Sequence, residues 1–260
     1  MTTLFDALYS VARLLAQKVE NVATGGSATT LVYGASPYAD DYFNGGTILF
    51  LSGNNASKSA TITDFAKSTG TFTFATQAGL CAAGNRFLAL SPAYPREELV
   101  GVVNSALTEI GKVNQFMTTT IVADQEQYTL PEGVNDVRRV EIAQNLTSPY
   151  GWTPHFNWNE LAGNIFFTAN VPSEDGYLMR VWHCSPHASV SADDDVIAGD
   201  INPGRLAITA LWYALSARSR NISNSDVNIK DDLDKTLADK MREEQLHPVR
   251  LMAKDPKVSA

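Results

Sequence analysis

The sequence has few of the residues that build metal and redox sites: its 260 residues include two cysteines and four histidines. Cys81 and Cys184 are far apart in the chain, and we expect both to stay reduced rather than form a disulfide. No apolar run approaches the roughly 20 residues that a membrane-spanning helix needs, so no membrane partner is expected. The first six residues carry no basic cluster and lead into an amphipathic pattern. This start predicts a protein that stays in the cytoplasm where it is made.

The motifs of common enzyme classes are also missing. The chain has no Gly-x-x-x-x-Gly-Lys phosphate loop, no Gly-x-Ser-x-Gly nucleophile elbow and no spaced carboxylate pair in a recognisable cleft context. We therefore expect no enzymatic activity and no cofactor. The formal net charge of −8 argues against a protein that coats nucleic acid, since such binding neutralises phosphates. It is compatible with a surface past which DNA slides.

A metal site is the first chemical candidate. His183, Cys184 and His187 place three potential zinc ligands within five residues, and His155 is a possible fourth. Pro186 prevents the two histidines from aligning on a helix, and no second Cys/His pair follows. A strand end with solvated imidazoles is the favoured interpretation, so no metal is expected, and a metal-dependent hydrolase is the weaker alternative.

Two further clusters have simpler explanations. Asp193–Asp195 lacks the alternating oxygen ligands and distal Glu of a calcium loop, so an acidic turn is favoured. An aromatic group could stack on a sugar or a base, although buried packing or a subunit contact is favoured. Its members are Trp152, His155, Phe156 and Trp158.

Four segments have helical patterns. Apolar residues recur every three or four positions from Leu4 to Val22, and again from Leu99 to Val113 after Pro95. Asn202 and Pro203 start a helix that is apolar nearly all round to Arg218. A last helix ends near Leu246 and repeats an apolar residue every four positions, at Ile229, Leu233, Leu237 and Met241.

Between these helices the sequence has short β-branched and aromatic runs separated by turn residues. Five strands are predicted in the first such region, at Thr29–Tyr33, Thr47–Leu51, Ser59–Phe65, Thr71–Ala75 and Arg86–Leu90. Five more are predicted in the second, at Thr119–Val122, Gln127–Leu130, Val137–Ala143, Asn164–Thr168 and Tyr177–Cys184.

Together these patterns predict an α+β fold in which a helical bundle scaffold carries a small inserted antiparallel β barrel or sandwich and a second β-rich region. Residues 1–24, 94–116 and 201–246 would form the scaffold. The inserted module would be 25–93, the second β region 117–200, and an extended C-terminal arm 247–260.

This layout resembles the head-to-tail adaptor, or connector, proteins of the neck of tailed bacteriophages. The resemblance rests on four short phrases: Tyr94-Pro-Arg-Glu-Glu-Leu99, Val103-Asn-Ser-Ala-Leu107, Tyr128-Thr-Leu-Pro-Glu-Gly133 and Val137-Arg-Arg-Val140. Gly46–Gly53 and Ala60–Phe65 are similar to a β module inserted in several virion structural proteins. The similarity covers most of the chain as a layout, with short motifs.

The resemblance implies a structural virion protein that is made in the host cytoplasm and resides in the neck between capsid and tail. It implies a ring of identical subunits, usually a dodecamer, that joins the portal protein to the tail or tail-terminator protein. Double-stranded DNA would pass through the lumen without specific binding. A sugar-binding or receptor-binding virion protein is the alternative function.

Two sets of residues are assigned roles on this basis. Trp212 is a candidate subunit-interface anchor, because its bulk and indole N–H suit that position, and a position in the core of the chain is the equal alternative. The C-terminal arm is basic while the chain is acidic, and it would bind the portal through Val249, Arg250, Leu251, Met252, Lys254 and Lys257.

Overall fold

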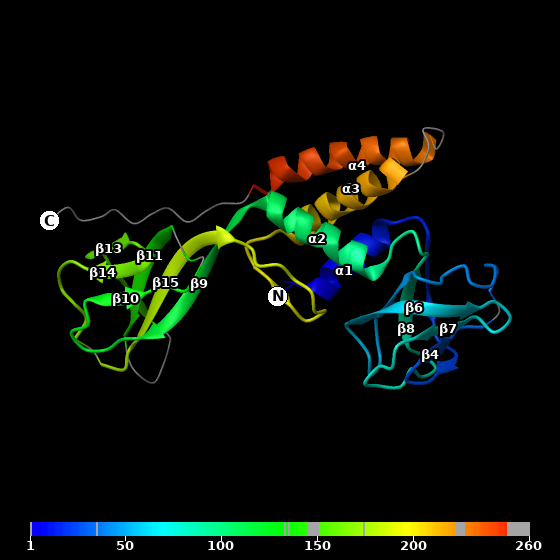
Figure 1. Ribbon diagram of the computed structural model, residues 1–260, viewed down its shortest axis with the longest axis horizontal. Coiled ribbons are helices and arrows are strands. Elements are labelled where there is room, and N and C mark those ends of the chain that lie inside the picture. The colour runs from blue at the N-terminus through cyan, green and yellow to red at the C-terminus, as the bar shows by residue number, and fades with distance from the viewer. Residues whose placement is uncertain are drawn as a thin grey trace. The chain divides into compact units, whose positions relative to one another are not determined.

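The computed structural model describes residues 2–34, 36–132, 134, 136–144, 151–173, 175–221 and 227–248 (Figure 1). These residues form four helices and sixteen strands, and the strands make four antiparallel sheets. The fold is therefore mostly β, and the expectation of a helical bundle scaffold with a small inserted barrel is wrong. Sequence periodicity overstated the helices, because segments at two predicted helix ends pair with strands and belong to sheets.

The chain divides into two compact units. The first contains Met1–Ile110 and Ala188–Pro248, and the second contains Gly111–His187. Each unit has its own apolar core and is described separately.

Helix α1 (Leu4–Leu14) shows both what the pattern predicts and where it fails. Thr3 Oγ1 accepts the Asp6 N–H, and the Asp6 carboxylate accepts the Thr3 N–H, so a capping box fixes the start. The predicted helix continued to Val22, but Lys18–Val22 is strand β2 and pairs with β8 (Arg86–Leu90). The longer helix is wrong because β8 supplies the hydrogen-bond partners of that segment.

Helix α2 (Arg96–Ile110) also ends before the predicted boundary. Gly111 has φ of 86°, a conformation that glycine adopts without steric cost, and it terminates the helix. Val113, predicted to be helical, lies in strand β9 (Lys112–Thr120). The chain therefore passes from the first unit into the second through a single left-handed residue.

Helices α3 (Pro203–Asn221) and α4 (Val227–Leu246) follow the second unit in sequence. The Asn202 side chain accepts the Arg205 N–H at 3.0 Å and caps α3. Helix α3 contacts each of the other three helices and lies between α2 and α4 in Figure 1. A short sheet of β1 (Thr2–Thr3) and β16 (Val196–Ile197) adjoins the start of α1.

The remaining strands of the first unit form a seven-stranded sheet in the order β2-β8-β5-β6-β7-β4-β3. Its aromatic core includes Phe43, Phe50, Phe65, Phe72 and Phe87, all nearly inaccessible to solvent. The strands not yet given are β3 (Gly25–Gly26), β4 (Thr30–Val32), β5 (Thr47–Phe50), β6 (Lys58–Ala66) and β7 (Thr71–Phe74).

The second unit is a sandwich of two sheets with orders β10-β14-β13 and β12-β11-β15-β9. Trp158 and Phe167 of one sheet and Val140 and Met179 of the other share one core. Its other strands are β10 (Gln127–Thr129), β11 (Val137–Ala143), β12 (Trp152–His155), β13 (Trp158–Leu161), β14 (Asn164–Phe167) and β15 (Leu178–Pro186).

Candidate assembly surface

A charged side chain lies in the contact between α3 and α4. The Lys240 ammonium is 4.9 Å from the centre of the Trp212 ring and 3.3 Å from a Glu244 carboxylate oxygen, and it also pairs with Glu109 of α2. Burial by itself would lower the pKa of Lys240, but Glu109 and Glu244 outweigh it and raise that pKa above its ordinary value. The Lys240 side chain therefore stays protonated at neutral pH. Helix α4 packs on α3 through this cation, which contacts the Trp212 ring and pairs with Glu109 and Glu244.

Two residues of the α4 apolar stripe are consequently turned away from α3. Leu237 and Met241 are 39% and 56% exposed, whereas Thr236 is buried and Lys240 is largely covered. Residues four apart lie on the same side of a helix, so the two apolar side chains form one exposed ridge. We call Leu237 and Met241 the ridge.

Helix α3 is flanked by open hollows on both sides. One, of about 480 Å³, lies between α1 and the start of α3. Another, of about 470 Å³, lies between α3 and α4 beside the end of α1. The two share Leu14 and Ile208, and together they are here called the α1–α3 groove. A third, of about 750 Å³, lies between α2 and α3. It is lined in part by Pro92, Gly101, Val102, Ala214 and Ala217. The three helices around α3 therefore leave part of its apolar surface uncovered.

Trp212, the predicted interface anchor, is partly buried within the chain. Its ring meets Tyr213 edge to face, with centroids 5.1 Å apart, and lies under the Lys240 ammonium. On the same helix Leu206, Ala210 and Leu215 are buried. A role for Trp212 in subunit contact stays a prediction.

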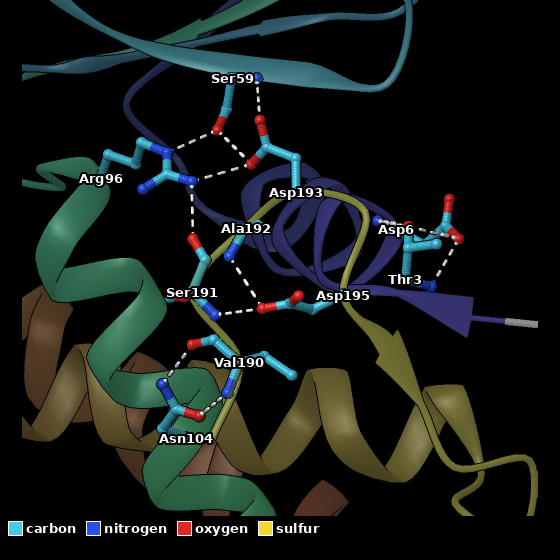
Figure 2. Close-up of polar contacts among 10 residues, drawn as sticks. All are labelled: Thr3, Asp6, Ser59, Arg96, Asn104, Val190, Ser191, Ala192, Asp193 and Asp195. Carbon is cyan, nitrogen blue, oxygen red and sulfur yellow. Dashed lines mark hydrogen bonds and ion pairs between the residues drawn. The ribbon is translucent and has the colours of Figure 1, made fainter. Parts of the chain in front are cut away.

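A second polar site fastens the seven-stranded sheet to the helices. The buried Asp193 carboxylate accepts both the backbone N–H and the hydroxyl of Ser59, each at 2.6 Å, and pairs with Arg96 at 3.0 Å (Figure 2). Arg96 also donates to the Ser59 hydroxyl at 2.7 Å. Sequence analysis missed this clamp, because Ser59 and Asp193 are 134 residues apart and no local pattern links them.

The neighbouring residues hold the segment Val190–Asp195 in place. The Asn104 amide of α2 bonds both the N–H and the carbonyl of Val190 at 2.9 Å (Figure 2). The Asp195 carboxylate accepts the N–H groups of Ser191 and Ala192, and these bonds lower its pKa. Asp193 and Asp195 thus act as structural acceptors, and no three His, Cys, Asp or Glu side chains in the described residues are arranged to hold a metal ion.

The residues of the metal candidate are on and beside strand β15. His183 points into the core of the sandwich, and burial lowers its pKa below the ordinary value. Cys184 is a buried thiol, as is Cys81 of the first unit. His155 lies on β12, where its ring packs edge to face on Phe167 at 4.9 Å.

The candidate aromatic platform is divided between different environments. Trp158 is in the core of the sandwich, while Phe156 is 44% exposed. The Trp152 ring stacks on the Arg180 guanidinium, 3.9 Å from its centre. These residues do not present a common stacking surface.

The candidate portal-binding residues, Val249, Arg250, Leu251, Met252, Lys254 and Lys257, lie outside the described residues. None of the described helices is long and apolar enough to cross a membrane. No protein-family model matches the chain, and a search of curated proteins returned no match.

Proposed function

We propose that this protein is a structural subunit of a head-to-tail adaptor ring in the neck of a tailed bacteriophage. The observation that carries the proposal is the apolar surface left open around α3, which comprises the ridge, the α1–α3 groove and the hollow between α2 and α3. Clustered apolar surface of this kind marks protein association sites. A subunit that contacts a neighbour on each side needs two such faces.

The ring would join the portal protein to the tail or tail-terminator protein and form part of the DNA conduit. The net charge of −8 supports a conduit rather than a DNA-binding protein, since negative surfaces repel phosphates. In this proposal the protein works by assembly, without catalysis.

Immunogold labelling of the virion tests the location, and co-sedimentation with purified portal rings tests the partner. We expect gold at the neck and stoichiometric ring-on-ring complexes visible in negative stain. Labelling confined to tail fibres would contradict the proposal and favour the receptor-binding alternative.

A further inference from the structure

The ridge and the α1–α3 groove both contain exposed apolar side chains. The ridge consists of two flexible apolar side chains one helical turn apart, with Met241 the more exposed. The groove contains Leu14, which is 49% exposed, beside Ile208 of α3. The ridge and the part of the groove between α1 and α3 are thus mainly apolar surfaces that are exposed to solvent in the single chain.

The two surfaces lie on opposite flanks of α4. The groove is lined on its α4 side by Asp232, Thr236 and Asp239. Successive residues rotate by about 100° around a helix, so the covered position Lys240 lies between that side and the ridge. A chain therefore cannot place its ridge in its own groove, but a second copy can occupy it.

The charges beside the ridge complement those of one part of the groove, the part between α1 and the start of α3. Arg13 is the only charged residue among those described that line the part of the groove between α1 and the start of α3. Asp234 is exposed one turn before Leu237, and Glu244 follows Met241 by three residues. Asp234 and Glu244 beside the ridge thus complement Arg13 in that part of the groove, whereas the part next to α4 is lined by both signs of charge, at Arg218, Lys235, Asp232 and Asp239.

We propose that the ridge of one copy packs into the α1–α3 groove of the next copy, with Asp234 facing Arg13. The contact joins two different faces, so its repetition produces a ring or a filament rather than a closed pair. This inference rests on the proposed function, for which it names the interface between neighbouring subunits.

Disulfide trapping tests the contact. The full chain carrying both Leu14→Cys and Met241→Cys is oxidised at high protein concentration and resolved on a non-reducing gel. The two native cysteines are buried, which limits background. We expect a ladder of covalent multimers from the double variant and monomers from each single variant, with circular dichroism showing that all are folded.

Leu246 supplies the matched control, because it is 57% exposed on α4 but lies about 180° around the helix from Leu237. The pair Leu14→Cys and Leu246→Cys should give monomers. A ladder from this control pair, no ladder from the ridge pair, or dimers from Met241→Cys alone would each overturn the proposed contact.

Charge reversal provides a second readout. Arg13→Asp or Asp234→Arg in the ridge-pair background should each reduce the multimer yield about two- to fivefold, as expected for an exposed ion pair, and the two together should restore it. Immunogold labelling of the neck separates the two hypotheses. If the protein is found in the neck but does not cross-link, only the proposed interface is contradicted. If the protein cross-links into a ladder but is absent from the neck, only the adaptor function is contradicted.

Discussion

At the scale of single residues, the most heavily used carboxylate is that of Asp193. It is buried and hydrogen-bonded to a strand of the seven-stranded sheet and to the first residue of α2. Removing one partner of a buried ion pair leaves the other charge buried without compensation. The resulting loss of folding stability is larger than the net stabilisation that the pair provides. The clamp should therefore matter for stability although it performs no chemistry.

Asp193→Ala should lower the free energy of unfolding of the first unit by about 3–5 kcal/mol, because it leaves the Arg96 charge without its carboxylate partner and the Ser59 N–H without an acceptor. Asp194→Ala is the matched control: Asp194 is exposed, and its loss should change stability by less than about 0.5 kcal/mol. Urea denaturation followed by circular dichroism measures both. Equal effects of the two substitutions would show that the clamp is not stabilising.

His183 gives the second unit a predictable pH dependence. Burial lowers its folded-state pKa below the unfolded value of about 6.5, so the unfolded chain binds the proton first as the pH falls. The contribution of neutral His183 to folding stability is fully present above about pH 6.5. It is lost as the pH falls through the pKa that His183 has in the folded protein. Urea unfolding at pH 7.5 and 5.5 should show lower stability at the acid pH, and His183→Leu should reduce the difference. His187→Leu is the control, and an identical reduction in it would contradict this assignment.

At the scale of elements, the sequence predicted strands better than helix ends. The runs Thr47–Leu51 and Arg86–Leu90 became strands because β-branched and aromatic residues are bounded there by turn residues. Helical spacing misled the prediction at Val19, Val22 and Val113, because partners distant in the chain supply these segments with sheet hydrogen bonds.

The packing of α4 also depends on residues distant in the chain. Its four-residue apolar repeat predicts that the stripe packs inward, but Lys240 takes the inner position because Glu109, 131 residues away, and Trp212 surround it. Neither the ridge nor the Asp193 clamp can be read from local patterns. The start of α3, in contrast, was predicted correctly from Asn202 and Pro203, because helix capping is a local interaction.

Excision of the seven-stranded sheet is the prediction at this scale. Replacing Ala28–Leu90 by a Gly-Ser linker would leave β2 without its partner strand β8. Replacing Val19–Leu90 by the same linker removes both strands. This second variant keeps Lys18, whose ammonium caps α1 by donating to the Leu15 carbonyl. We expect the second variant to keep its helical circular dichroism and to melt at a higher temperature than the first. A lower melting temperature for the Val19–Leu90 variant would show that β2 stabilises the helices without its partner.

At the scale of the whole molecule, the two units have separate cores, joined in sequence by Ile110–Gly111 and by His187–Ala188. The first unit contains all four helices and the apolar surfaces proposed for assembly. Subunit contacts can therefore form through the first unit while the sandwich remains folded on its own core. Two separate cores are compatible with the proposed adaptor, which would bind more than one partner.

The C-terminal arm is where an assembled ring is proposed to engage the portal. His247–Ala260 has Arg250, Lys254 and Lys257 against the single acid Asp255, in a chain whose net charge is −8. Basic and apolar side chains on one short segment suit a peptide that binds an acidic partner surface. Deleting Arg250–Ala260 should leave the circular dichroism and melting temperature unchanged, since the cores and helices precede the deletion, but should abolish co-sedimentation with portal rings. Replacing Arg250, Lys254 and Lys257 by Gln is the finer test: binding should weaken and lose its salt dependence, and undiminished docking of either variant would show that another surface binds the portal.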